Sequence, residues 1–187
     1  MPKDEPETVA LPTKAGRDSI KNQADLAKLG EIMGFRIWIP RNDRAAILQH
    51  WQPAGGTLVD TLPLNYDNTT LETIEQIDVL WLKGRAIQRA FEVEHSTAIY
   101  SGLLRMADLL ALQPNMNIAL LIVAPAERRD KVLSEIRRPV FSLLEHQPLA
   151  ERCTFIAYED LREIMSLKHL GHLSDSVLEE YEEVAYE

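Results

Sequence analysis

The stretch IDVLWLKGRAIQRAFEVE, residues 77–94, decides the fold of this chain because it predicts two strands joined by a tight turn. Apolar residues alternate with other residues along both halves, which is the period-two pattern of strands. Residues 83–85 form the expected turn. If the turn is centred on its third residue, Asp78 stands opposite Glu92, and Glu94 follows on the same side.

This pairing of acids has a chemical consequence. Directly opposed side chains on neighbouring strands lie about 5 Å apart, and like charges at that distance destabilise a sheet. Asp78 and Glu92 therefore need a positive partner. Mg2+ meets that need, because it binds carboxylate oxygens together with water and substrate phosphates. The hairpin thus indicates a metal site, and a solvated acidic face is the alternative interpretation.

Length and composition predict one soluble domain. The chain has 187 residues, of which 45% are hydrophobic, and this suffices for a single core. The single cysteine, Cys153, excludes an internal disulfide framework and a Cys-rich zinc site. The charged, Pro-containing N-terminus has no apolar signal region, and the apolar run at 118–124 is too short to cross a membrane. We therefore expect a cytoplasmic protein with no membrane partner.

The net charge of −9 argues against non-specific binding to a polyanion. The acids are unevenly distributed, however, because the last nine residues contain five glutamates and no base. Basic clusters lie in the rest of the chain, and each is either a solvated surface or a contact for a polyanion. They are Arg36/Arg41/Arg44, Lys83/Arg85/Arg89, Arg128/Arg129/Lys131 and Arg137/Arg138.

Periodicity divides the chain into a disordered leader (1–17), a folded domain (18–173) and an acidic tail (174–187) that is expected to fray. Segment 41–70 is ambiguous, since its first part fits a helix and the rest fits a loop. The expected elements are a helix from 18 or 19 to 34, a strand at 36–40, the hairpin at 74–94, a helix at 96–112, a strand at 117–124, a helix at 126–144 that Pro139 kinks or divides, a strand at 154–159 and a short helix at 159–167. This order predicts a three-layer α/β core with a mixed central sheet flanked by helices.

The order of elements and the acids of the hairpin resemble the PD-(D/E)XK nuclease superfamily, the restriction endonuclease-like fold, over roughly residues 18–160. Asp78 matches the first acid of the motif. Glu92-Val93-Glu94 matches the (D/E)-x-K tripeptide, with thirteen residues between Asp78 and Glu92. Glu94 departs from the pattern, because it stands where most members have lysine. Glu31, on the first helix, matches an acid that many members place near the same metal.

The resemblance implies hydrolysis of DNA phosphodiester bonds with Mg2+, or Mn2+ in its place. Asp78, Glu92 and the backbone carbonyl of Val93 would hold the metal, Glu94 would bind a second ion or orient the attacking water, and Glu31 would complete the shell. Arg105, eleven residues past Glu94, would stabilise charge in place of the missing lysine, and Lys83 or Arg85 at the hairpin tip are alternatives. A homodimer would supply two sites for the two strands of a duplex.

Two other interpretations stay open. The missing lysine and the acidic balance fit a catalytically inactive nuclease-fold module that binds nucleic acid or protein. A small α/β protein whose acids are merely exposed is the third.

Overall fold

The computed structural model describes residues 14–94, 99–112, 117–143 and 148–185, which form an α/β fold around a six-stranded sheet. The strands lie side by side in chain order. They are β1 (Arg36–Trp38), β2 (Val79–Lys83), β3 (Ala86–Val93), β4 (Ala119–Ala124), β5 (Cys153–Ala157) and β6 (Glu183–Val184). Strands β3, β4 and β5 are parallel, whereas the other neighbours are antiparallel. The predicted mixed sheet is confirmed.

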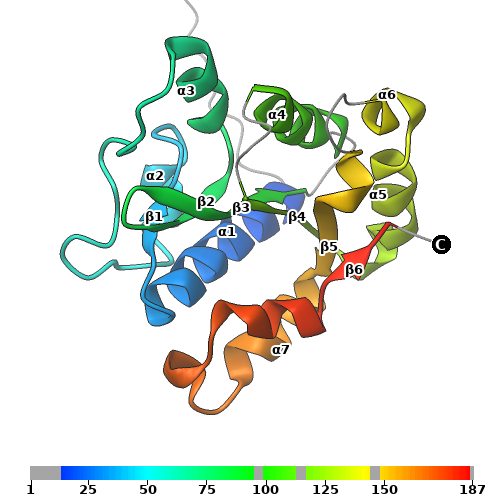
Figure 1. The fold of residues 1–187 in the computed structure, drawn as a ribbon. Coiled ribbons are helices and arrows are strands. Elements are labelled where there is room, and N and C mark those ends of the chain that lie inside the picture. The colour runs from blue at the N-terminus through cyan, green and yellow to red at the C-terminus, as the bar shows by residue number, and fades with distance from the viewer. Residues whose placement is uncertain (1–13, 95–98, 113–116, 144–147, 186–187) are drawn as a thin grey trace, which may run out of the picture.

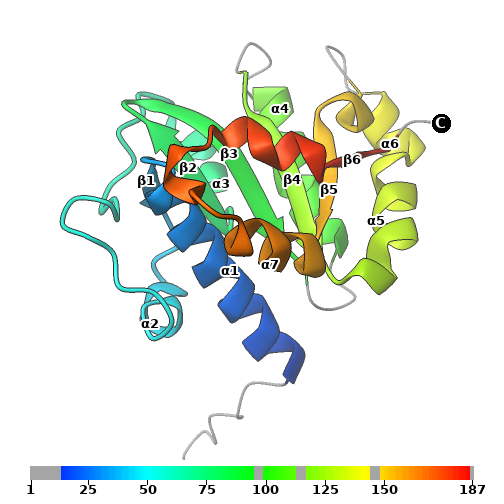
Figure 2. The ribbon, with the colours of Figure 1, turned by 90° about the horizontal axis from the view of Figure 1, so that it is seen from below.

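Helices cover both faces of the sheet. Figure 1 shows α3, α4 and α6 on one face and α1 and α7 on the other, and Figure 2 shows α1 and α7 side by side. One apolar core lies under α3, α4, α5 and α6, and a second lies under α1 and α7. The helices are α1 (Lys14–Ile32), α2 (Arg44–Ile47), α3 (Asn68–Ile74), α4 (Ile99–Leu112), α5 (Arg129–Ile136), α6 (Pro139–Ser142) and α7 (Tyr158–Ser166), with 3-10 helices η1 (Ala126–Arg128), η2 (Leu149–Glu151), η3 (Leu170–His172) and η4 (Asp175–Glu180). Within the described ranges, no helix is long and apolar enough to cross a membrane.

The first helix packs unusually close to the sheet. A β-carbon at Gly30 would lie 2.5 Å from Nε1 of Trp81, so only glycine permits this approach. The same indole nitrogen donates a hydrogen bond to the carbonyl oxygen of Leu26, 3.1 Å away. The helix begins at Lys14, earlier than the expected start at 18 or 19, and Gly34 follows its end with φ +85°.

The hairpin reaches the predicted register by an unexpected route. Its turn holds two residues between β2 and β3, and by itself this would pair Asp78 with Phe91. A register shift beyond Trp81 places one extra residue, Gln88, in β3, so that Val79 pairs with Phe91. Continuing this register sets Asp78 opposite Glu92. Since a shift of one residue moves every side chain to the other face, the bulge puts Asp78 on the face of Glu92.

The ambiguous segment 41–70 and the helix predicted over 126–144 are resolved by the structure. Residues 44–47 form the short α2. The stretch PLNYDNTT, residues 63–70, was expected to be a loop, and residues 63–67 are one. Its last three residues instead start α3, because the side chain of Asp67 accepts a hydrogen bond from the backbone N–H of Thr70 at 3.0 Å. Pro139 divides the later helix as predicted, with α5 before it and α6 beginning at it.

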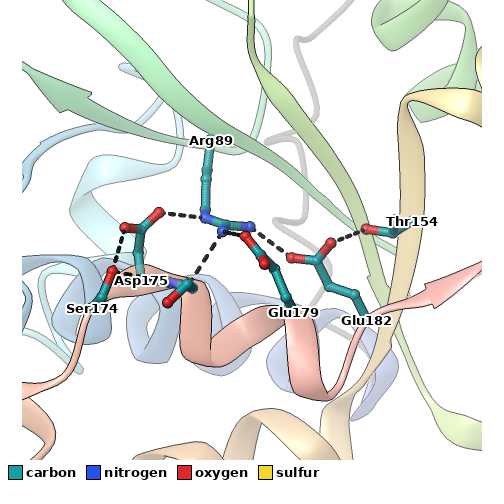
Figure 3. Close-up of polar contacts among 7 residues, drawn as sticks. Arg89, Thr154, Ser174, Asp175, Glu179 and Glu182 are labelled. Carbon is teal, nitrogen blue, oxygen red and sulfur yellow. Dashed lines mark hydrogen bonds and ion pairs between the residues drawn. The ribbon is translucent and has the colours of Figure 1, made fainter.

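The acidic tail does not fray over the residues that the structure describes. Arg89 on β3 is 4% exposed, and its guanidinium bonds to Asp175 at 2.9 Å and to Glu182 at 2.6 Å. Figure 3 shows this cluster, in which Thr154 also donates to Glu182, at 3.0 Å. Three acids of the tail, Asp175, Glu179 and Glu182, thus pair with one buried arginine. The predicted leader lies outside the described residues except for its last four, 14–17, which start α1.

Candidate active site

The three acids of the hairpin converge at one end of β2 and β3. Asp78 directly precedes β2, Glu92 is the last but one residue of β3, and Glu94 follows β3. The backbone N–H of Val93 donates a 2.7 Å hydrogen bond to Oδ2 of Asp78. This bond fixes the first acid of the motif to the strand that carries the other two.

Glu92 is fully buried and bound at two points by Arg105 from α4. Its Oε1 lies 2.8 Å from Nε of Arg105, and its Oε2 lies 2.5 Å from Nη2. The Glu92 side chain has no exposed area, whereas that of Arg105 is 27% exposed. Forked bonds of this kind are among the strongest polar contacts in proteins. The structure thus places Arg105 against Glu92, one of the three acids of the hairpin.

Glycine at position 102 brings α4 against the acids. A β-carbon there would lie 2.5 Å from Oε1 of Glu94 and 3.2 Å from Oε2 of Glu92. Gly102 and Arg105 are three residues apart and share one helix face, which points at the carboxylates.

The end of β3 is held in place by its neighbours. The backbone N–H of Glu94 donates to the carbonyl of Val123 on β4 at 2.8 Å, and the hydroxyl of Tyr158 donates to the carbonyl of Glu94 at 2.7 Å. Glu94 itself is 5% exposed. Its position is therefore rigid, because two hydrogen bonds fix the backbone that carries it.

Burial raises the pKa of all three acids. Loss of water raises the pKa of Asp78 to about 6, although the Val93 N–H and the charge of Arg105 oppose the rise. Burial and the charge of Asp78 raise the pKa of Glu94 to about 7. Burial also raises the pKa of Glu92, against the two-point bond to Arg105. The pKa values of Asp78 and Glu94 therefore lie near neutral pH, so a cation bound by these carboxylates would compete with protons.

Two polar residues of α1, Ser19 and Gln23, lie beside the backbone of Val93 and were not predicted from the sequence. The hydroxyl of Ser19 donates to the carbonyl oxygen of Val93 at 3.4 Å, and the amide of Gln23 donates to Ser19 at 3.3 Å. Oε1 of Gln23 has no hydrogen-bond partner among the described residues. Two polar residues, four apart on the buried face of an amphipathic helix, were the available signal.

Glu31 does not join the other acids, which corrects its predicted place in the metal shell. It lies twelve residues after Ser19 on α1, or about 18 Å along the helix axis. Its carboxylate instead accepts hydrogen bonds from Nε1 of Trp51 at 2.7 Å, from the N–H of Ala54 at 2.6 Å and from Oγ1 of Thr57 at 3.0 Å. Glu31 is therefore the anchor of the loop that follows α2.

The hairpin tip is also remote from the acids. Lys83 ends β2 and Arg85 lies in the turn, so the five residues of β2 separate them from Asp78 by about 15 Å. Neither can take the place of the missing lysine. Residues 95–98, which include the expected start of the helix predicted over 96–112, lie outside the described residues.

Comparison with known proteins gives the family. The family described as "Type II restriction enzyme NmeDI C-terminal domain" matches residues 1–185. The chain belongs to this family. It is 33% identical over 159 residues to the type II restriction enzyme NmeDI of Neisseria meningitidis serogroup C. The match covers 81% of this chain and 43% of that enzyme, so the chain spans less than half the length of this relative. No solved structure matches the chain significantly.

In this member of the NmeDI C-terminal domain family, the donor set suits a hard divalent cation. Three carboxylates and a backbone carbonyl are the oxygen ligands that Mg2+ and Mn2+ take in proteins. Within the described ranges, however, no three His, Cys, Asp or Glu side chains are already placed as ligands of a metal ion. The expected ready-made cation pocket is thus absent from this part of the chain, and a guanidinium lies among the acids instead.

Proposed function

We propose that this domain is a metal-dependent endonuclease that hydrolyses phosphodiester bonds in DNA. The observation that carries the proposal is the convergence of Asp78, Glu92 and Glu94 at the end of the central hairpin, in a chain of a restriction enzyme family. DNA as the substrate and Mg2+ as the cofactor are part of this proposal. So are the cytoplasmic location and the homodimer, which would cut both strands.

The proposed roles follow from the positions of the groups. Asp78, Glu92 and the carbonyl of Val93 would hold the ion, which would lower the pKa of a bound water and stabilise charge on the scissile phosphate. Glu94 would bind a second ion or orient the attacking water, since it lies beside Glu92 at the face of α4 that carries Gly102. Arg105 stays protonated, so it acts through its charge and not as a base.

Cleavage of supercoiled plasmid tests the proposal. We expect nicked and linear products with Mg2+ or Mn2+, none in chelator, and a loss of at least about a hundredfold in Asp78→Ala and Glu92→Ala. The matched control is Glu72→Ala. Glu72 is an acid of α3 outside the proposed site, so this variant should cleave like the wild type. Undiminished cleavage by Asp78→Ala would exclude this site.

A second candidate function is that of a module that binds DNA or protein without catalysis. It is favoured because Arg105 binds both oxygens of Glu92 and because Glu94 replaces the lysine of the motif. Such a module would bind DNA or protein but would cleave DNA with neither metal. Its heat of Mn2+ binding would not change when Asp78 is replaced.

A further inference from the structure

The guanidinium of Arg105 uses the oxygens that a metal would need. Each of its two bonds goes to a different oxygen of Glu92, at 2.8 Å and 2.5 Å, so the carboxylate is occupied from one side by a single rigid fork. Glu92 is fully buried and cannot turn outward to water. A cation approaching Glu92 from that side must therefore compete with Arg105.

The charges of the other two acids also act on the same guanidinium. Hydrogen bonds to Glu92, together with the charges of Glu92, Asp78 and Glu94, raise the pKa of Arg105 further above its ordinary value. Without a positive charge beside them, the buried carboxylates of Glu92 and Glu94 and the partly buried carboxylate of Asp78 would repel one another. Arg105 thus supplies, within the chain, the charge that a divalent ion would supply from outside.

The side chain of Arg105 lies partly at the protein surface. Its side chain is 27% exposed, in contrast to its buried partner, and it is long and flexible. Gly102, three residues earlier on α4, adds no side chain beside the acids. The guanidinium can therefore swing toward solvent while α4 and β3 stay in place.

We propose that Arg105 is a resident counter-cation, which holds the three acids together in the metal-free protein and which a divalent ion must displace from Glu92 in order to bind. This inference rests on the proposed function. It makes Arg105 a positioning residue that sets metal affinity, and it accounts for the absence of a ready-made ligand set among the described acids.

Calorimetric titration with Mn2+, without DNA, tests this inference on the wild type, Arg105→Gln and Arg128→Gln. Arg128 is the matched control, because its charge also acts on Glu94 but no hydrogen bond joins it to Glu92. The titration is run at about pH 8.5, so that protons do not replace the lost guanidinium on acids whose pKa is raised. We expect Arg105→Gln to bind Mn2+ about tenfold tighter or more, and Arg128→Gln to stay within about threefold of the wild type.

Thermal unfolding gives a second readout. In chelator, Arg105→Gln should have a lower Tm than the wild type, because the acids lose their counter-charge, and Mn2+ should raise its Tm more than that of the wild type. If Arg105→Gln does not fold in chelator, recovery of the fold on addition of Mn2+ would equally show that the metal replaces the charge of Arg105.

The outcomes separate the inference from the proposed function. Equal or weaker Mn2+ binding by Arg105→Gln would overturn the counter-cation role and leave the nuclease proposal intact. An equal gain in Mn2+ affinity in Arg105→Gln and Arg128→Gln would also overturn the counter-cation role, because the loss of one positive charge would then explain the effect. No Mn2+ binding by the wild type or by Arg105→Gln would overturn both proposals.

Discussion

Gly102 and Glu94 approach so closely that a β-carbon on the helix would lie 2.5 Å from Oε1 of the acid. Glycine within a helix costs up to about 1 kcal/mol relative to alanine, and Gly102 is the fourth of the fourteen residues of α4. The close approach explains the glycine, since the nearest atoms belong to Glu92 and Glu94, which are both buried and so have little room to move aside.

We therefore predict that Gly102→Ala lowers both metal affinity and DNA cleavage, by about tenfold or more, because Glu94 must move away from the other acids. The net change in the free energy of unfolding should be small or destabilising, despite the better helix propensity of alanine. Mn2+ titration and plasmid cleavage measure these effects. Gly171→Ala is the control, since a β-carbon there meets only atoms of Ile32 at an ordinary 3.7 Å. Equal activity of both variants would contradict the prediction.

The raised pKa values of Asp78, about 6, and Glu94, about 7, predict how stability depends on pH without metal. In the unfolded chain both carboxyls release their protons near pH 4, so between about pH 4 and 7 the folded state holds the extra protons. Stability should therefore fall as pH rises through this window and level off above it, by several kcal/mol in total.

The double variant Asp78→Asn/Glu94→Gln isolates this effect from that of the other acids. Its denaturant midpoint is subtracted from that of the wild type at each pH. With saturating Mg2+ the slope should reverse, because ionised carboxylates bind the metal. A difference that does not change between pH 4 and 8 would show that the two acids titrate normally.

Glu31→Gln should destabilise the protein by about 1–2 kcal/mol without changing metal affinity. The carboxylate accepts three hydrogen bonds from the loop after α2, and an amide would set its NH2 group against one of those donors. Trp51 fluorescence during urea unfolding measures the loss. A drop in Mn2+ affinity would instead return Glu31 to the metal shell.

Arg89→Met should cost about 2–4 kcal/mol and free the C-terminal segment, because it leaves Asp175 and Glu182 facing the sheet without a counter-charge. Urea unfolding and limited proteolysis of the C-terminal residues measure the two effects. Arg129→Met is the comparison. Arg129 also pairs with a glutamate of the tail, Glu183, but its side chain is 45% exposed, so its loss should cost much less than that of Arg89. Similar costs for both variants would contradict the anchoring role of Arg89.

The elements that local pattern governs were predictable. The alternation along Val79 to Val93 marked the hairpin, the apolar run before Ala124 marked a covered strand, and Pro139 marked the break between α5 and α6. Helix α3 was not predictable from apolar periodicity, because it begins with Asn-Thr-Thr and depends on one capping bond from Asp67.

The sequence by itself determined that Asp78, Glu92 and Glu94 share a hairpin, since strand periodicity and spacing are local properties of the chain. Only the tertiary structure decided which cation faces them and which acid is excluded. Arg105 meets Glu92 because α4 packs on β3 at a glycine, whereas Glu31 is carried away by the length of α1. Such contacts depend on the packing of distant segments, which no spacing along the chain records.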